Sequence, residues 1–373
     1  MVKNPLSHPP TPARRGALFT DFVLASSARF LRPWLWRGAS WRTGVGRVRS
    51  LGFLTILLFS PLTFLLGILI VPSIRAAEPH LTTASQKSGT EVTLMSVYFR
   101  NPSLGWAVGS GGTLLKTTDG GLKWKKQTSG TSAQLTGVFF VDDKTGWIIG
   151  VNGTIRHSVD GGATWKPQSI GSVTPMYGIS FVSSQEGWVV GGNGTILHTI
   201  DGGTHWTDQS SSTTAALYAV QFLTPQRGTA VGAVGTVLAT EDGGATWIAQ
   251  ETQGSVTLFD VYFSDPLTGW VVGNAGAMFQ TTDGGRRWID RTLPCSRTCT
   301  RLTDLLRIRF TDPKTGWIVG ERGMAYHTGD SGFTWEEQGA VANVSLFGLS
   351  FPTTMHGWAS GERGTIVHLK INK

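Results

Sequence analysis

Six copies of one acidic motif are the residues of this chain whose types and spacing best suit chemistry. They read "TTDGGLKW", "SVDGGATW", "TIDGGTHW", "TEDGGATW", "TTDGGRRW" and, more loosely, "TGDSGFTW". A carboxylate beside glycines could take part in cleaving a sugar, bind a cation or simply close a tight turn. The aspartates of the six copies are Asp119, Asp160, Asp201, Asp242, Asp283 and Asp330.

The spacing of the copies bears on the choice between these roles. Seven segments, most of them reading Gly-Trp-x-x-Gly, begin at Gly105, Gly146, Gly187, Gly228, Gly269, Gly316 and Gly357. The steps between them are 41, 41, 41, 41, 47 and 41 residues. Each unit contains four short β-type segments, which is the size of one propeller blade. The sequence therefore predicts an all-β, seven-bladed β-propeller over residues 82–373.

In such a fold the six aspartates lie at one repeated position, between the third and fourth strands of a blade. An aspartate can accept hydrogen bonds from backbone N–H groups there, glycines can adopt positive φ, and the tryptophan can pack against the blade. An active site is normally built once in a chain. We therefore predict that the motif is a structural turn.

The two ends of the repeat region predict how the ring closes. The seventh unit ends at Lys373 without a fourth strand, while "HLTTASQKSGTEV" precedes the first unit and belongs to no blade of its own. We expect residues near 82 to 90 to complete the seventh blade and so remove the open sheet edges. Residues 73–81 then form a linker.

The net charge of +8 comes from the first fifty residues, which hold nine Lys and Arg against Asp21 alone. The remainder is balanced, so no nucleic-acid-binding domain is expected. Residues 51–72 carry no charge and are long enough, at about 1.5 Å per residue, to cross a hydrocarbon core of roughly 30 Å. They predict one transmembrane helix with tail 1–50 in the cytoplasm and the propeller exported. The sequence leaves open whether this span is a retained anchor or a cleaved signal.

Two cysteines, Cys295 and Cys299, occur in "CSRTC". In an exported protein they are expected to form a local disulfide. No further metal ligands lie near them in the sequence. The histidines that share one repeat position, His157, His198, His327 and His368, lie on strands too far apart to bind one ion. Neither a metal nor another cofactor is therefore predicted.

Arginines supply the candidate binding residues. Arg322 and Arg363, next to Glu321 and Glu362, fall in equivalent turns of blades 6 and 7 and could bind a carboxylate bidentately. Five more lie around the one longer repeat: Arg286, Arg287, Arg291, Arg297 and Arg301. We interpret that insertion as a binding loop on a functional face, and we expect blades 5 to 7 to present one basic face that includes these arginines with Arg322 and Arg363. A merely solvated basic surface is the alternative in both cases.

Enzymatic readings find less support in the residues. A sialidase would need an arginine cluster, a tyrosine nucleophile and a separate acid. Four of the five tyrosines (Tyr98, Tyr177, Tyr218, Tyr262 and Tyr326) occupy the repeated first strand, where packing explains them, and no F/Y-R-I-P motif is present. No Ser-His-Asp elbow, phosphate loop or H-E-x-x-H motif is present either.

The pattern S/T-x-D-G-G-x-x-W is the Asp-box, or BNR repeat. Together with "GW-x-x-G" and a period near 41, it resembles the photosystem II stability and assembly factor family over residues 81–373, with non-photosynthetic bacterial relatives included. The resemblance implies a seven-bladed exported propeller without enzymatic activity, which binds newly made reaction-centre protein through a basic patch. The basic tail and the apolar span depart from that family, because they form neither a transit peptide nor a lipoprotein signal.

These observations predict a monomeric protein-binding factor for a membrane complex, on the periplasmic, lumenal or extracellular side. Its partner would be a membrane protein or the exported tail of one. A glycan-binding or cell-surface propeller is the first alternative and would require solvent-facing tryptophans. A sialidase-like hydrolase is the second. Neither the identity of the partner nor a photosynthetic host follows from the sequence.

Overall fold

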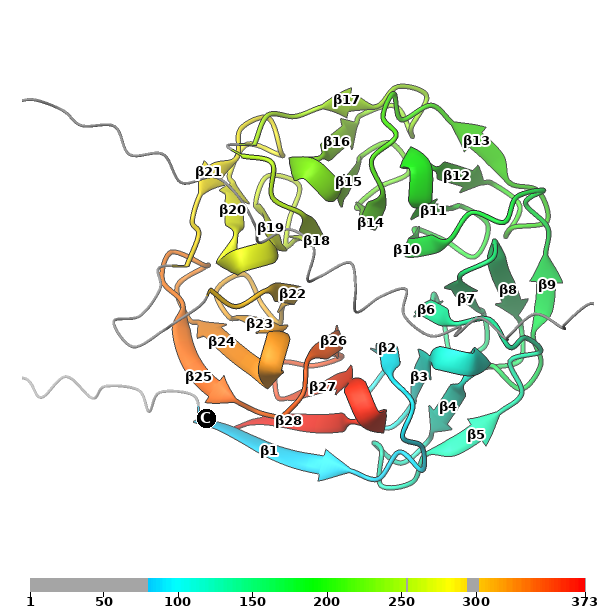
Figure 1. Ribbon diagram of the computed structural model, residues 1–373, viewed down its shortest axis with the longest axis vertical. Helices are drawn as coiled ribbons and strands as arrows, with labels where there is room; N and C mark the ends of the chain where they lie inside the picture. The colour runs from blue at the N-terminus through cyan, green and yellow to red at the C-terminus, as the bar shows by residue number, and fades with distance from the viewer. Residues whose placement is uncertain (1–79, 253, 294–301, 373) are drawn as a thin grey trace, which may run out of the picture. The chain divides into compact units, whose positions relative to one another are not determined.

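The repeats form seven four-stranded antiparallel sheets arranged in a ring (Figure 1). The computed structural model describes residues 80–252, 254–293 and 302–372. The expected membrane span 51–72 and the cysteine pair lie outside these residues, so both remain predictions. Among the residues that are described, no helix combines the length and apolarity needed to cross a membrane.

Each blade is a meander whose first strand lies nearest the ring axis. The strands of blades 1 to 4 are β2 (Leu94–Phe99), β3 (Gly105–Gly109), β4 (Leu114–Thr117) and β5 (Lys125–Gln127); β6 (Leu135–Phe140), β7 (Gly146–Gly150), β8 (Thr154–Ser158) and β9 (Lys166–Gln168); β10 (Met176–Phe181), β11 (Gly187–Gly191), β12 (Ile196–Thr199) and β13 (Thr207–Gln209); β14 (Leu217–Phe222), β15 (Gly228–Gly232), β16 (Val237–Thr240) and β17 (Ile248–Ala249).

The strands of blades 5 to 7 are β18 (Leu258–Phe263), β19 (Gly269–Gly273), β20 (Met278–Thr281) and β21 (Ile289–Asp290); β22 (Leu305–Phe310), β23 (Gly316–Gly320), β24 (Met324–Thr328) and β25 (Glu336–Ala340); β26 (Leu346–Ser350), β27 (His356–Gly361), β28 (Ile366–Asn372) and β1 (His80–Gln86). Short 3-10 turns join the second and third strands of six blades: η1 (Ser110–Gly112), η2 (Gly192–Gly194), η3 (Ala233–Gly235), η4 (Asn274–Gly276), η5 (Glu321–Gly323) and η6 (Glu362–Gly364).

The first and last strands of the chain close the ring together. β1 pairs antiparallel with β28 in continuous register, from His80 opposite Asn372 to Gln86 opposite Ile366. Figure 1 shows the two strands side by side at the edge of blade 7. β1 begins at His80, inside the segment expected to be a linker, and ends before residue 90. It supplies the fourth strand that the seventh repeat lacks.

The Gly-Trp-x-x-Gly segments form the second strands, and all five of their residues are buried in blade after blade. A Cβ on Gly146 would lie 2.4 Å from the Phe140 ring, and one on Gly150 would lie 2.3 Å from the Gln134 carbonyl oxygen. Such distances are well inside van der Waals contact. Both glycines are therefore required because the second strand packs directly against the first.

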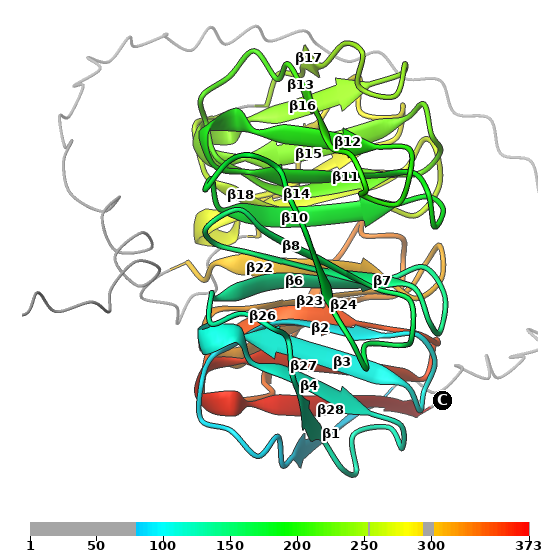
Figure 2. The same ribbon diagram turned by 90° about the vertical axis from the view of Figure 1, so that its right-hand side faces the viewer.

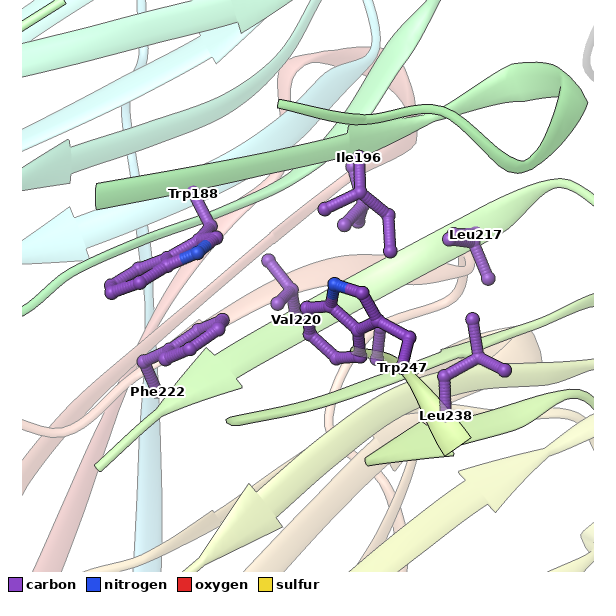
Figure 3. Close-up of a cluster of buried hydrophobic side chains, with 9 residues drawn as sticks. Trp188, Ile196, Leu217, Val220, Phe222, Leu238 and Trp247 are labelled. Carbon is purple, nitrogen blue, oxygen red and sulfur yellow. The ribbon is translucent and has the colours of Figure 1, made fainter. Parts of the chain in front are cut away.

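The tryptophan of each such segment fills the interface with the next blade. Between blades 3 and 4, the Trp188 ring stacks on Phe222 with centroids 3.4 Å apart, and Trp247 meets Phe222 edge-on (Figure 3). The Trp188 Nε1 donates to the Gly243 carbonyl at 3.2 Å, and His198 covers its other face at 4.5 Å. Stacked aromatic pairs add about 0.5–1.5 kcal/mol beyond the burial of their surface.

Successive connections in a meander alternate between the two ends of the ring. The turns between second and third strands therefore lie at one end, which we call the turn face, and Figure 2 shows the 3-10 turns gathered there on the left. The Asp-boxes lie at the opposite end, which we call the box face. A residue's place in the meander thus decides which face it belongs to.

Candidate functional site

Each Asp-box aspartate is fully engaged by its own turn. Asp160 Oδ1 accepts hydrogen bonds from the Thr164 backbone N–H at 2.9 Å and from the Ser158 hydroxyl at 2.8 Å. The Ser158 oxygen in turn accepts from the Gly162 N–H at 2.8 Å. The Thr164 hydroxyl bond to the other carboxylate oxygen is the main cause that lowers the pKa of Asp160 to about 2. These aspartates hold turns and are not arranged for catalysis.

The same bond from the N–H four residues on reaches every Asp-box aspartate, at 2.9–3.0 Å: Asp119, Asp160, Asp201, Asp242, Asp283 and Asp330. Within the described ranges, no three His, Cys, Asp or Glu side chains gather in a way that could hold a metal ion. The repeated histidines instead stack on the tryptophans of their own blades, as His157 does on Trp147 at 4.7 Å.

The tyrosines of the first strands connect neighbouring blades. The Tyr98 hydroxyl donates to the Phe140 carbonyl at 2.7 Å, and the Tyr262 hydroxyl donates to the Phe310 carbonyl at 3.1 Å. Burial raises the pKa of both hydroxyls above the ordinary value. A buried hydroxyl with a raised pKa is a poor nucleophile, so these two residues do not fit the role that a sialidase would require.

The tryptophans of the ring are unavailable for binding sugars. Every one between residues 80 and 372 is buried or half-buried, including the six that stack between blades. A glycan site built on stacking needs exposed aromatic faces. The observation on which the glycan-binding alternative depended is therefore absent from the described part of the chain.

Charge at the ring axis gathers in one place. The seven innermost strands contain three charged residues, Asp260 on β18 and Arg307 and Arg309 on β22, which we call the axis cluster. Arg309 Nη1 lies 2.6 Å from Asp260 Oδ2, and its guanidinium lies over the Tyr262 ring at 5.9 Å. The cluster therefore joins blades 5 and 6 beside the ring axis.

The axis cluster carries one positive charge in excess. Asp260 Oδ2 also accepts from the Ile308 backbone N–H at 3.0 Å, so this buried carboxylate is held by blade 6 from two sides. Burial lowers the pKa of the Arg307 guanidinium, and the charge of Asp260 opposes that effect. A guanidinium stays protonated in proteins. One carboxylate thus balances only one of the two arginines.

Arg322 and Arg363 lie at the turn face on adjacent blades, and we call this pair the basic rim. Both adopt left-handed backbone conformations, with φ of 56° and 54°. The Arg322 side chain is 59% exposed, while that of Glu321, whose Oε1 lies 4.0 Å from Arg322 Nε, is only 20% exposed. The cation therefore projects farther into solvent than the carboxylate beside it.

The structure separates the other predicted arginines from the basic rim. Arg286 and Arg287 belong to the Asp-box of blade 5, and Arg286 Nη2 lies 3.6 Å from Glu241 Oε1 of blade 4. Because this box joins a third strand to a fourth, both arginines lie on the box face. The prediction of a single basic face containing all the arginines is wrong for these two.

Arg291 contacts two side chains of the propeller and is not free to bind a partner through its whole guanidinium group. Its Nε donates to Gln280 Oε1 at 3.2 Å, and its guanidinium lies over the Phe333 ring at 5.8 Å. It thereby ties blade 5 to the Asp-box of blade 6. Arg297 and Arg301 lie outside the described residues, so their part in binding remains a prediction.

Sequence reasoning missed Asp260, although a signal for it exists. The third residue of the innermost strand is small in five blades: Ser96, Gly137, Gly178, Ala219 and Gly348. Blades 5 and 6 have Asp260 and Arg307 there. Charges at a position that is otherwise small, on neighbouring blades, indicate an interaction that repeat packing does not require.

The family model of the photosynthesis system II assembly factor YCF48 matches residues 123–214 and 248–338. The chain is similar to the photosystem II assembly factor-like family of BNR propellers over these two stretches, which together make up just under half of it. No curated protein matches its sequence.

Several solved structures share the fold of this photosystem II assembly factor-like chain. One is a YCF48 bound to a D1 peptide, at 21% identity and a TM-score of 0.65, covering 78% of this chain and 95% of that one. Another is YCF48 from Cyanidioschyzon merolae, at 20% identity and a TM-score of 0.65, covering 77% and 98%. A streptogramin B lyase, at 12% identity and a TM-score of 0.62, covers 78% and 98%. At these identities the likeness shows the fold alone.

Proposed function

We propose that this propeller is a non-enzymatic factor that binds a segment of a membrane protein during the assembly of a membrane complex. The observation that carries the proposal is the axis cluster of blades 5 and 6, which has one arginine more than it has carboxylates; the exposed arginines of the basic rim add to it. The family supports it, because its model describes an assembly factor and one solved YCF48 is bound to a D1 peptide.

The axis cluster supplies a fixed charge that suits an acidic ligand. Its one uncompensated guanidinium lies among innermost strands that are otherwise uncharged, in surroundings where water screens charge poorly. A carboxylate of a side chain or of a chain terminus matches the fork of an arginine. We therefore propose an acidic or C-terminal segment as the part of the partner that is bound.

The basic rim supplies the entrance. Arg322 and Arg363 project from turns whose backbone is fixed between two buried strands, so little order must be gained when they bind. Both lie on the same face as the entry to β22, because Leu305 pairs with Gly320 immediately before η5. A segment that enters at the turn face would meet the rim first and the axis cluster next.

The rest of the chain gives this proposal its setting. We propose that residues 51–72 hold the propeller at the membrane and that the propeller works as a monomer on the exported side. Tethering would raise the effective concentration of membrane partners. Cys295 and Cys299 would form a disulfide in the loop of the longer repeat, beside Arg297 and Arg301.

Crosslinking of the full-length protein in cells, followed by identification of the captured membrane proteins, tests the proposal. We expect Arg322→Glu with Arg363→Glu to reduce the capture of one membrane protein by at least about tenfold, because a hydrogen bond to a charged group contributes about 1.5–3 kcal/mol. Lys123→Glu with Arg287→Glu is the matched control, since it makes the same change of charge at exposed Asp-box residues on the box face. That control should capture as the unaltered protein does.

Three results would contradict the proposal. Equal loss in the two double variants would point to a general effect of net charge. Unchanged capture in the rim variant would remove the basic rim from binding. Failure to capture any membrane protein with the unaltered chain would remove the assembly role itself.

A further inference from the structure

The interface between blades 4 and 5 lacks the tryptophan that fills its counterparts. The second strand of blade 4 reads "GTAVG", so Thr229 stands where the other six blades have tryptophan. Ala239 on β16 stands at the position of His198, the side chain that covers the outer face of Trp188 in blade 3. Both layers of the stack are therefore missing from one interface.

A pocket of about 320 Å³ lies at this position. Thr229 and Ala239 line it from blade 4, and Phe263, Gly284 and Gly285 line it from blade 5. The equivalent residues around Trp188 are Phe222, Gly243 and Gly244, so the pocket occupies the space that a tryptophan ring fills one blade earlier (Figure 3). Small-ligand sites measure about 300–1,000 Å³, and this pocket lies at the lower end.

Two of the groups that contact the indole of Trp188 have unused equivalents at the pocket, the Phe263 ring and the Gly284 carbonyl. The Phe263 ring meets Trp288 edge-on at 5.9 Å, as Phe222 meets Trp247, but no tryptophan stacks on its other face. Among the described residues no hydrogen bond reaches the Gly284 carbonyl, whereas the Gly243 carbonyl accepts from Trp188 Nε1 and Gln209 Nε2. A Cβ on Gly285 would meet nothing nearer than 3.6 Å, against 2.0 Å for Gly244.

A buried polar atom beside the pocket is also without its partner. Gln209 Oε1 accepts from Trp247 Nε1 at 3.1 Å between blades 3 and 4. The equivalent glutamine, Gln250, instead turns its Nε2 towards the Ile248 carbonyl at 3.2 Å. Trp288 Nε1 is left buried with no hydrogen-bond partner, as is Trp335 Nε1 at the interface of blades 5 and 6. Leaving a buried donor unsatisfied costs about 1–3 kcal/mol.

The charges around the pocket differ in how they are balanced. Arg286 and Glu241 are both in the lining and form an ion pair with each other. Arg227 also lines the pocket, is half-buried, and has no ion pair within the described part of the chain. Its guanidinium lies close to Gly284. An anionic group on the ligand would pair with this arginine.

We propose that this pocket binds an indole that carries a carboxylate. The ring would stack on Phe263, and its carboxylate would meet Arg227 beside Gly284. The indole could come from a free indole carboxylic acid or from a tryptophan at the C-terminus of a peptide, since both have the same chemistry. The site lies on the box face and is independent of the basic rim and the axis cluster.

Ligand-observed saturation-transfer NMR on the full-length protein tests the proposal, with indole-3-acetate and the tripeptide Gly-Gly-Trp as probes. We expect saturation transfer to at least one probe. Thr229→Trp should weaken that binding by at least tenfold, because the new side chain would fill the pocket. Transfer to indole-3-acetate supports a free acid as the source, and transfer to the tripeptide alone supports a chain terminus.

Arg227→Gln separates the charge from the ring. It should weaken the binding of indole-3-acetate about tenfold while leaving the binding of neutral indole unchanged. This variant keeps the test valid if Thr229→Trp does not fold, which thermal unfolding of each variant would reveal. No transfer to either probe at millimolar concentration would overturn the proposal, as would equal affinity in unaltered protein and a folded Thr229→Trp.

Discussion

The interface between blades 3 and 4 and the interface between blades 4 and 5 are formed by equivalent strands of their blades. The first encloses Trp188 between Phe222 and His198, and the second encloses a pocket above Phe263. The propeller is closed although one interface holds a tryptophan and the other a pocket. The contacts of a propeller interface are thus separable. One interface can lack its tryptophan side chain while the strand pairing and the neighbouring blades maintain the fold.

The largest effect is expected from removing the tryptophan side chain from the interface between blades 3 and 4. Trp188→Thr should lower the free energy of unfolding by about 3–5 kcal/mol, because it deletes a buried aromatic side chain and leaves a cavity. Guanidinium unfolding monitored by fluorescence measures this loss. Thr229→Ala is the matched control and should change stability by less than about 1 kcal/mol. Equal effects would mean that the two interfaces are not built differently.

The glutamines make a second matched pair. Gln209→Ala leaves Trp247 Nε1 without a partner and leaves the Gly243 carbonyl with Trp188 Nε1 alone, so it should cost about 1–3 kcal/mol. Gln250→Ala should stay within about 0.5 kcal/mol, since Gln250 bonds only to the carbonyl two residues before it. Urea unfolding of both variants checks this. A large loss for Gln250→Ala would show that Gln250 also ties its interface.

Adding a tryptophan to the interface between blades 4 and 5 should have a smaller and opposite effect on stability. Thr229→Trp should raise the free energy of unfolding by about 0.5–2 kcal/mol, the usual gain from filling a cavity. The double variant Thr229→Trp with Ala239→His should resemble the interface of blades 3 and 4 and gain slightly more. Differential scanning calorimetry measures the shift. A loss of stability would mean that the pocket has the wrong shape for a ring.

The smallest difference in stability between the two interfaces is expected from the Asp-boxes, because each interface contains one. The pKa of Asp160 and of Asp242 is lowered to about 2, chiefly by the hydroxyls of Thr164 and Thr246. Their ionised forms therefore stabilise the fold above pH 4, and that contribution disappears as the pH falls from about 4 to 2. Thr246→Val should flatten the acid limb of a plot of unfolding free energy against pH. An unchanged limb would contradict this assignment.

Much of the fold was predictable because the repeat is regular. The 41-residue period and the Gly-Trp segments predict the seven blades, and the missing fourth strand of the last repeat predicts that the start of the propeller completes it. These features depend on residues near one another in the sequence, or on positions that recur. Packing of that kind can be read from a pattern.

The site was less predictable because it depends on contacts between blades and on the direction of strands. Asp260 and Arg309 lie in different blades, so no local pattern joins them. The basic residues of blades 5 to 7 predict one face, but the connections of a meander alternate between the two ends of the ring, so Arg286 and Arg322 lie at opposite ends. The side-chain orientation of Gln250 beside the pocket follows from no rule of composition.

The pairing of β1 with β28 also determines how late in synthesis the propeller can close. Thr82 and Lys370 hydrogen-bond across 288 positions of the chain. Since a ribosome delivers the N-terminal part first, β1 must wait unpaired until the last residues have emerged, while blades 1 to 6 can already assemble. A transcript or chain broken before Ile366 would therefore yield a nearly complete ring with two exposed strand edges. Such an edge invites pairing with other chains, so premature termination near the end of translation should produce aggregates.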